Sequence, residues 1–128
     1  MRYLLDTHLL IWFGYYPEKL SPVAYELLGD PDSGLYFSVA SIWESAIKFN
    51  VGRRDFQHAP QILRTECKRN NMEELDVKGE HAEAIAQLPP LHKDPFDRIL
   101  VAQATIEGIT LLTSDRKLTA YPGPIQLV

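Results

Sequence analysis

The sequence predicts a single α/β domain in which a central parallel sheet lies between layers of helices. Its 128 residues match the commonest domain size, and 45% hydrophobic residues are enough for a core. Short apolar runs alternate along the chain with longer helical patterns. The apolar runs are continuous instead of alternating with polar residues, which is typical of strands that are buried on both faces.

The first part of the chain is expected to form one strand and two helices. Arg2–Leu5 has the character of a short strand, and the apolar segment His8–Phe13 is expected to be a helix closed by Gly14. Ser21–Gly29 is predicted to be the second helix, because its first serine is a good N-cap and Pro22 suits the first helical position.

A strand and two helices are expected in the middle of the chain. The segment Asp30–Gly34 has the composition of a turn, and it leads into a buried strand at Leu35–Ser38. Ser41–Val51 is predicted to be a helix that stops at Gly52. Pro60–Asn70 is predicted to be an amphipathic helix, because it has apolar residues at helical spacing.

The last part is expected to contain three strands and two longer helices. A short strand at Met72–Val77 precedes a helix at Gly79–Leu88, which ends before two prolines. Asp94–Glu107 is predicted to be an alanine-rich helix with the acid as N-cap, a proline at the first helical position and Gly108 after its end. The chain is then expected to close with a strand, a helical turn and a last strand: Ile109–Thr113, Asp115–Leu118 and Ile125–Val128.

The composition restricts the class of protein. The longest apolar stretch, 7–17, is too short for a membrane helix, and Asp6 interrupts the N-terminal apolar run, so no signal peptide is expected. Cys67 is the single cysteine, which fits a reducing, cytoplasmic location. The net charge of −4 argues against a simple nucleic-acid-binding module, since such domains usually carry a basic surplus.

Four acidic residues stand out because each follows a predicted strand or lies in a helix. Each one alone has a structural explanation. Asp6 and Asp115 lie where aspartate commonly caps a helix, and Glu44 fits a capping box with Ser41. Asp97 lies in the first turn of a predicted helix, where the helix dipole favours an acid.

Together, the four acids predict a divalent-metal site. Residues at the ends of parallel strands meet at the carboxyl edge of the sheet, where open α/β folds place their sites. Four carboxylates packed together cannot all stay ionised without a cation. Oxygen ligands without cysteine or clustered histidine favour Mg²⁺ or Mn²⁺. Such a centre suits phosphodiester hydrolysis by an activated water.

Other catalytic patterns are absent from the sequence. It contains no phosphate-binding glycine-rich loop, no dinucleotide-binding fingerprint and no nucleophile elbow. Cys67 lies in a predicted helix and is expected to be an inert core residue. The histidines lack the spacing of metal ligands and are expected to be surface or packing residues: His8, His58, His81 and His92.

Four segments resemble the motifs of one protein family. They are Tyr3–His8 (YLLDTH), Ser41–Glu44 (SIWE), Asp94–Ala104 (DPFDRILVAQA) and Leu112–Asp115 (LTSD). In this order, and over the whole chain, they resemble the PIN-domain ribonucleases, and more narrowly the VapC-type toxins of bacterial and archaeal toxin–antitoxin pairs. Asp94–Ala104 is the most specific of the four segments.

The resemblance implies a PIN-like three-layer α/β/α fold, a homodimer, and a Mg²⁺- or Mn²⁺-dependent endoribonuclease with RNA as substrate. Asp6 and Asp97 match the principal metal ligands of the family, and Glu44 and Asp115 match the acids that complete the site. Three neighbours are implied as supporting residues: Thr7, Asp94 and Ser114. The family also implies a VapB-like antitoxin, which often blocks the site with a basic side chain that pairs with the carboxylates.

Aromatic and basic residues suggest further contacts. The aromatic residues within 12–16 are expected to divide between the core and a contact with a partner chain, whereas Tyr36, Phe37 and Trp43 are expected in the core. Most basic residues are expected on solvated helix faces. Those beside the acidic motifs are expected to bind the RNA backbone at the rim of the site: Lys93, Arg98, Arg116 and Lys117.

Two alternatives to the nuclease stay open. One is a PIN-like module without catalysis that binds RNA or protein, although the presence of all four acids favours the enzyme. The other is a receiver or a phosphatase with an aspartyl nucleophile. It is disfavoured because His8 stands where the phosphatase motif needs a second acid, and no paired acids precede a strand.

Overall fold

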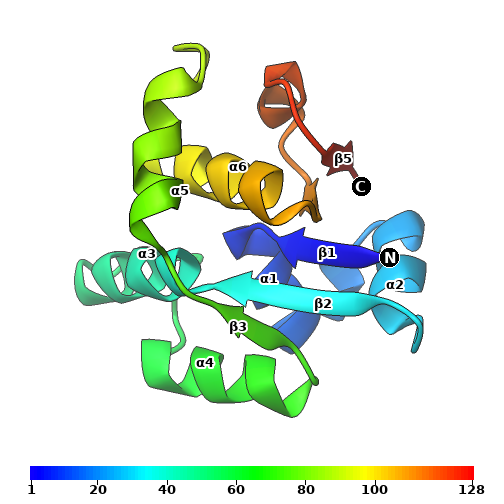
Figure 1. The fold of residues 1–128 in the computed structure, drawn as a ribbon. Helices are drawn as coiled ribbons and strands as arrows, with labels where there is room; N and C mark the ends of the chain where they lie inside the picture. Colours follow the sequence, from blue (N-terminus) through cyan, green and yellow to red (C-terminus); the bar gives the residue numbers. More distant parts are fainter.

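The computed structural model describes residues 1–128 and has a five-stranded parallel sheet at its centre (Figure 1). The strand order is β3-β2-β1-β4-β5, and all neighbouring strands are parallel. The strands are β1 Arg2–Leu5, β2 Gly34–Ser38, β3 Glu73–Leu75, β4 Thr110–Thr113 and β5 Ile125–Leu127. The parallel α/β fold that the continuous apolar runs predicted is therefore confirmed.

The strand order creates a switch point beside β1. After β1 the chain adds β2 and β3 on one side, and it then returns to the other side of β1 for β4 and β5. Leu5 at the end of β1 is in register with Leu112 of β4. In open parallel sheets, ligands bind outside the carboxyl ends of the strands where the order reverses. The ends of β1 and β4 therefore mark the expected place of a site.

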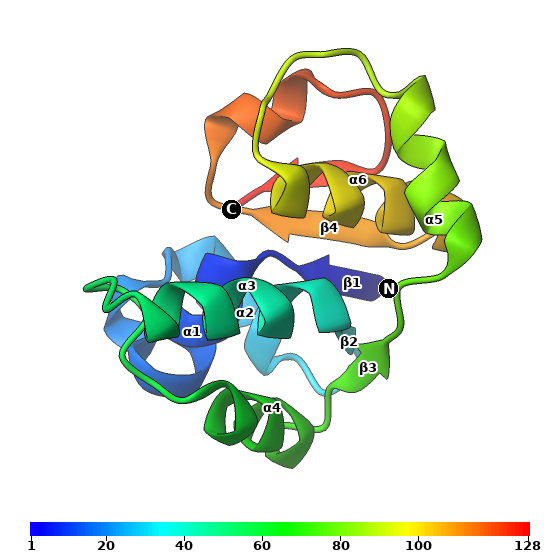
Figure 2. The ribbon, with the colours of Figure 1, turned by 90° about the vertical axis from the view of Figure 1, so that its left-hand side faces the viewer.

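Helices lie on both faces of the sheet and give three layers (Figures 1 and 2). α1, α2 and α4 share a core with one face, and α6, flanked by α5, packs on the other. α3 follows β2 directly and contacts α1, α4 and α6. The helices are α1 Thr7–Tyr15, α2 Pro22–Gly29, α3 Val39–Asn50, α4 Pro60–Arg69, α5 Gly79–Ala84 and α6 Pro95–Glu107, with 3₁₀ turns η1 Pro17–Lys19, η2 Ile85–Gln87 and η3 Arg116–Ala120. No helix has both the length and the apolar character needed to span a membrane.

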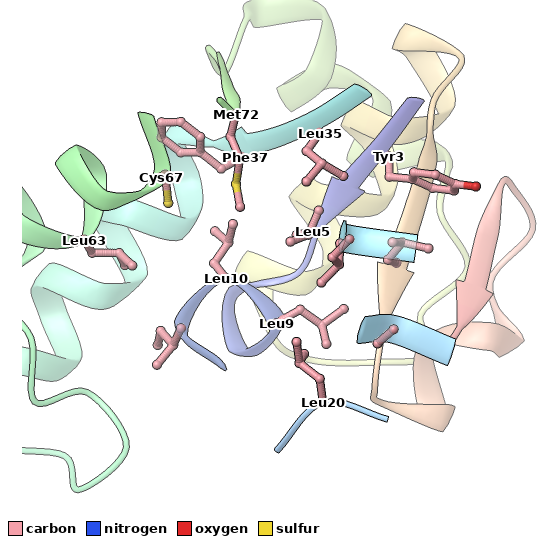
Figure 3. Packing of buried hydrophobic residues seen from close by; sticks show 14 of the residues in the cluster. Tyr3, Leu5, Leu9, Leu10, Leu20, Leu35, Phe37, Leu63, Cys67 and Met72 are labelled. Carbon is pink, nitrogen blue, oxygen red and sulfur yellow. The ribbon is translucent and has the colours of Figure 1, made fainter. Parts of the chain in front are cut away.

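Two hydrophobic clusters fix the position of β1. Tyr3 and Leu5 pack into the cluster formed with α1, α2 and α4, part of which is seen in Figure 3. Leu4 points to the opposite face and packs with Leu100 and Val101 of α6. This alternation follows from the two-residue period of a strand. Burial of each such side chain contributes about 1.5–3 kcal/mol, so the end of β1 is firmly held.

α1 does not end where the sequence predicted. It continues through Gly14 to Tyr15, and the amide of Tyr16 still donates to the carbonyl of Trp12 at 2.8 Å. A Cβ at position 14 would lie 3.4 Å from Glu66 Cγ of α4. This distance is an ordinary van der Waals contact, so Gly14 is a helical residue beside α4, and the predicted helix stop was wrong.

The predicted capping box of α3 is also wrong. The helix begins at Val39, and the hydroxyl of Ser38 caps it by accepting from the amide of Ala40 at 3.0 Å. β2 thus leads into α3 without a loop. Glu44 lies in the second turn as a result, and its carboxylate bonds to other side chains instead of the Ser41 amide.

Trp43 is exposed, whereas the sequence placed it in the core. Its exposed fraction is 63%, and its ring meets the ring of Phe96 edge-on at 5.2 Å. The buried face of α3 is largely polar and includes Ser41, Glu44 and Ser45, so the neighbouring Trp43 is directed away from the interior. Phe37 is fully buried as predicted.

Candidate metal centre

A polar hollow of about 180 Å³ lies at the carboxyl ends of β1 and β4. None of its lining residues is hydrophobic. All four predicted acids line it, together with the three predicted supporting residues, whereas Arg98 and Arg116 do not. The lining residues are Asp6, Thr7, His8, Glu44, Lys48, His92, Asp94, Asp97, Ser114 and Asp115.

Asp6 is the first residue after β1, and both of its carboxylate oxygens are held. Oδ1 accepts from the amide of Leu9 at 2.9 Å, so Asp6 caps α1 as the sequence predicted. Oδ2 accepts from the hydroxyl of Thr113 at 2.6 Å. The side chain is buried, and this burial raises the pKa of Asp6 above its ordinary value despite these hydrogen bonds.

Thr113 connects two of the acidic motifs. This fully buried residue ends β4, and its hydroxyl donates to Asp6 and accepts from the amide of Asp115 at 3.0 Å. Asp115 in turn caps η3, because its Oδ1 accepts from the amide of Lys117 at 2.9 Å. The ends of the neighbouring strands β1 and β4 therefore place Asp6 and Asp115 together at the hollow.

Glu44 enters the hollow from α3. Its Oε1 accepts from the hydroxyl of Thr7 at 2.6 Å, and its Oε2 pairs with the ammonium of Lys48. The hydroxyl of Ser41 lies 3.0 Å from that of Thr7. These contacts orient a buried carboxylate from two sides.

Asp97 belongs to the first turn of α6, directly after the cap that Asp94 provides through the amide of Phe96. The Nε2 of His92 lies 2.8 Å from Asp97 Oδ2. The pKa of Asp97 is raised to about 6, first by burial and then by the negative charges of Asp94, Glu44 and Asp6; the hydrogen bond from His92 opposes this rise. The acids thus act on one another electrostatically, as residues of a single site.

The donor set fits a hard divalent cation. Five carboxylates line the hollow, and Asp6 and Glu44 are buried there. Ligand atoms of His92, Asp94 and Asp97 lie within 4.8 Å of one another. The negative charges of these carboxylates repel one another, and this repulsion contributes to the raised pKa of Asp97. A bound cation would reduce the repulsion.

The raised pKa of Asp97 predicts that the metal-free protein loses stability as the pH rises. The folded protein holds this proton up to about pH 6, whereas the unfolded chain releases it near pH 3.8. Between these values the folded state binds more protons, so the free energy of unfolding falls with increasing pH, by about 3 kcal/mol at most. About half of this loss falls between pH 5 and pH 7.5, so we expect the melting temperature in EDTA to be about 5 °C lower at pH 7.5 than at pH 5.

Addition of Mn²⁺ at pH 7.5 should restore the lost stability, because an ion that binds only the folded state stabilises it. Differential scanning calorimetry measures both effects on the same sample. Equal melting temperatures at pH 5 and pH 7.5 in EDTA would contradict the raised pKa of Asp97.

Four residues in or beside this site were not predicted from the sequence: His8, Lys48 and His92 line the hollow, and Thr113 lies behind Asp6. His8 was placed among the surface or packing histidines. Lys48 was placed among the solvated basic residues, His92 among the surface or packing histidines, and Thr113 received no role beyond its strand. The signal for Lys48 was its spacing of four residues from Glu44, which puts both side chains on one helix face. His92 and Thr113 carry no such local signal, because their contacts depend on the tertiary fold.

Arg98 has a different place from the one predicted for it. Its guanidinium donates to the carbonyls of Ile85, Pro89 and His92 and to the hydroxyl of Tyr121, at 3.3 to 3.4 Å. It thereby holds the segment that carries His92. Its donors bind oxygen atoms of the protein itself, whereas the sequence predicted a contact with RNA. Arg116 and the neighbouring Lys117 are exposed on η3.

The remaining histidines pack against other side chains. The ring of His58 stacks on Tyr15 with centroids 3.6 Å apart. His81 is fully buried, and its Nε2 lies 2.8 Å from Oε2 of Glu107. His8 lines the hollow, and its Nε2 lies 3.0 Å from Asp55 Oδ2.

Comparison with known proteins agrees with this geometry. The chain is 26% identical over 123 residues to Ribonuclease VapC22 of Mycobacterium tuberculosis, and the match covers 94% of this chain and 92% of that protein. Its fold is similar to that of VapBC2 from Rickettsia felis bound to a DNA fragment from the promoter, with a TM-score of 0.72, 15% identity and coverage of 100% and 99% of the two chains. DNA-bound VapBC from Salmonella typhimurium is also similar, with a TM-score of 0.67, 16% identity and coverage of 98% and 97%.

The family assignment rests on the sequence as a whole. The PIN domain model matches residues 3–124, a range that contains all four predicted acids. The resemblance that the four motifs suggested is thereby confirmed, together with the PIN-like three-layer fold. The chain belongs to the PIN domain family.

Proposed function

We propose that this chain is a Mg²⁺- or Mn²⁺-dependent endoribonuclease that hydrolyses phosphodiester bonds of RNA. The observation that carries the proposal is the hollow at the switch point of the sheet, which is lined by five carboxylates and by no hydrophobic residue. The similar protein from Mycobacterium tuberculosis is named a ribonuclease, which supports RNA as the substrate.

Asp6 and Asp97 are the proposed principal metal ligands, and Glu44 and Asp115 complete the site. The hydroxyls of Thr113 and Thr7 orient Asp6 and Glu44 through short hydrogen bonds. A bound divalent ion would supply a Lewis acid for the phosphate group and would lower the pKa of an attacking water.

The first turn of α6 is positioned by its cap. Asp94 Oδ1 accepts from the amide of Phe96, which fixes the backbone one residue before Asp97. The Nε2 of His92 lies 2.8 Å from Asp97 Oδ2 and holds this carboxylate from the other side. We propose that Asp94 and Ser114 support the ligands through their positions in the hollow, as Thr7 does through its hydrogen bond to Glu44.

We further propose that the protein is the toxin of a toxin–antitoxin pair and acts as a homodimer. Similar solved structures are VapBC complexes, which supports a VapB-like antitoxin as its partner. An acidic hollow of this kind suits inhibition by an inserted arginine, because a guanidinium pairs with carboxylates in a bidentate manner and competes with the metal.

The test is incubation of the purified chain with total bacterial RNA, with Mn²⁺ or with EDTA, followed by sequencing of the new RNA ends. We expect cleavage with Mn²⁺ and none with EDTA. The products should carry 5′-phosphate and 3′-hydroxyl ends, because water attacks the phosphate in line without a covalent enzyme intermediate.

Two results would argue against the proposal. Products with 2′,3′-cyclic phosphate ends would exclude hydrolysis by activated water. Binding of Mn²⁺ without any cleavage of RNA would favour the module without catalysis.

A further inference from the structure

A lysine lies at the wall of the acidic hollow. Lys48 stands four residues after Glu44 on α3, and its Nζ lies 2.5 Å from Glu44 Oε2. The two side chains are 21% and 4% exposed, so water reaches the pair only in part. Nζ also lies 4.9 Å from the centroid of the buried Phe56 ring. The ammonium is therefore held by a carboxylate and by an aromatic face.

The ammonium of Lys48 has unused hydrogen-bonding capacity. It carries three N–H donors, and Glu44 is its one hydrogen-bond partner in the structure. Glu44 is more fully engaged, because the hydroxyl of Thr7 binds its other oxygen at 2.6 Å. Lys48 thus has two donors available for a ligand that enters the hollow.

Lys48 is also the one side chain with a permanent positive charge among the lining residues. Five carboxylates line the same hollow, so their negative charges repel an RNA phosphate that approaches it. None of the basic residues that the sequence places beside the acidic motifs is part of the lining: Lys93, Arg98, Arg116 and Lys117. Lys48 is therefore the side chain in the lining whose positive charge can attract a phosphate into the hollow.

We propose that Lys48 is a substrate-binding residue, whose ammonium contacts a non-bridging oxygen of the RNA phosphate while it keeps Glu44 in place. This inference rests on the proposed nuclease function. The same positive charge repels a divalent cation, so Lys48 strengthens phosphate binding and weakens metal binding. A salt bridge with a purely structural role would also weaken metal binding through Glu44, but it would not contribute a phosphate contact to the salt dependence of RNA binding.

The metal half of the inference is tested without RNA. Mn²⁺ binding to the purified protein is followed by electron paramagnetic resonance for the wild type, Lys48→Met and Lys48→Arg. We expect Lys48→Met to bind Mn²⁺ about fivefold more tightly, because the local repulsion is removed, and Lys48→Arg to match the wild type. Lys68→Met, at an exposed lysine of α4, is the matched control and should leave the affinity unchanged.

The RNA half uses Asp97→Asn as a background that does not cleave. Fluorescence anisotropy measures the binding of a labelled single-stranded RNA of mixed sequence at saturating Mn²⁺ and several salt concentrations. We expect Lys48→Met to weaken RNA binding about tenfold and to reduce the slope of log affinity against log salt by about 0.7, the value for one lost phosphate contact on a single strand. Lys48→Arg should keep the slope.

An unchanged RNA affinity and salt slope in Lys48→Met would overturn the inference and leave the nuclease function standing. Weaker Mn²⁺ binding in Lys48→Met would also overturn the inference, because Lys48 would then not repel the cation. If Asp97→Asn does not bind RNA and the wild type does not cleave it, the proposed function fails and the inference with it. Lys48→Gln, which retains a donor for Glu44 but no charge, replaces Lys48→Met if that variant melts early.

Discussion

Replacement of Asp97 by asparagine is expected to reduce RNA cleavage about a thousandfold and to leave the fold intact. Asparagine keeps the shape of the side chain and can still bond to His92, which lies 2.8 Å from Asp97 Oδ2. It loses the negative charge that the proposed metal site needs, and a thousandfold loss corresponds to about 4 kcal/mol of transition-state stabilisation. Initial rates on a defined RNA, with circular dichroism of the same sample, measure both outcomes.

The same substitution should stabilise the metal-free protein at pH 7.5. The pKa of Asp97 is raised to about 6 by burial and then by Asp94, Glu44 and Asp6, so its ionised form costs free energy at this pH. Asparagine removes that cost. We expect a melting temperature about 5 °C above that of the wild type in EDTA, and a weaker dependence on pH between 5 and 7.5.

Asp32→Asn is the matched control, because Asp32 is exposed in the turn before β2, away from the hollow. It should change neither the cleavage rate nor the melting temperature. If Asp97→Asn cleaved RNA at the rate of the wild type, Asp97 would not be one of the metal ligands. A lower melting temperature in EDTA would show that Asp97 stabilises the fold in its ionised form.

Helix ends with a complete local signal were predictable from the sequence. The Ser21 hydroxyl accepts from the Ala24 amide at 3.1 Å and starts α2, and Gly108 ends α6 with a φ of 68°. Both features depend on residues within one turn of the helix end. The start of α3 was missed, because Ser38 both ends β2 and caps the helix, while the sequence contains a second capping pattern three residues later.

The acids of the hollow were predictable because the carboxyl ends of adjacent parallel strands lie side by side at one edge of the sheet. Asp6 follows β1, and Asp115 follows the adjacent strand β4. Residues that act through long-range contacts were not predictable. The bond from Thr113 to Asp6 joins residues 107 positions apart, and His92 lies in a segment between η2 and α6 whose course is set by Arg98.

Replacement of Phe37 by alanine is expected to lower the free energy of unfolding by about 3–5 kcal/mol. Phe37 is fully buried, and it lies beside Cys67 and Met72 in the core (Figure 3). Its strand leads without a loop into α3, which carries Glu44 and Lys48. A cavity at this position therefore removes a large part of a typical domain stability and loosens the base of the helix that supplies the site. Urea denaturation followed by tryptophan fluorescence measures the loss.

Two further variants show whether the loss of unfolding free energy in Phe37→Ala comes from a cavity in the core or from the removal of an aromatic ring at any position. Phe37→Leu keeps most of the buried volume and should cost about 1–1.5 kcal/mol. Tyr25→Ala removes an aromatic ring that is 63% exposed on α2, and it should cost less than about 0.5 kcal/mol. If Phe37→Ala cost no more than Tyr25→Ala, the core would have to collapse around the missing ring. β2 would then shift, and with it the start of α3 and the position of Glu44.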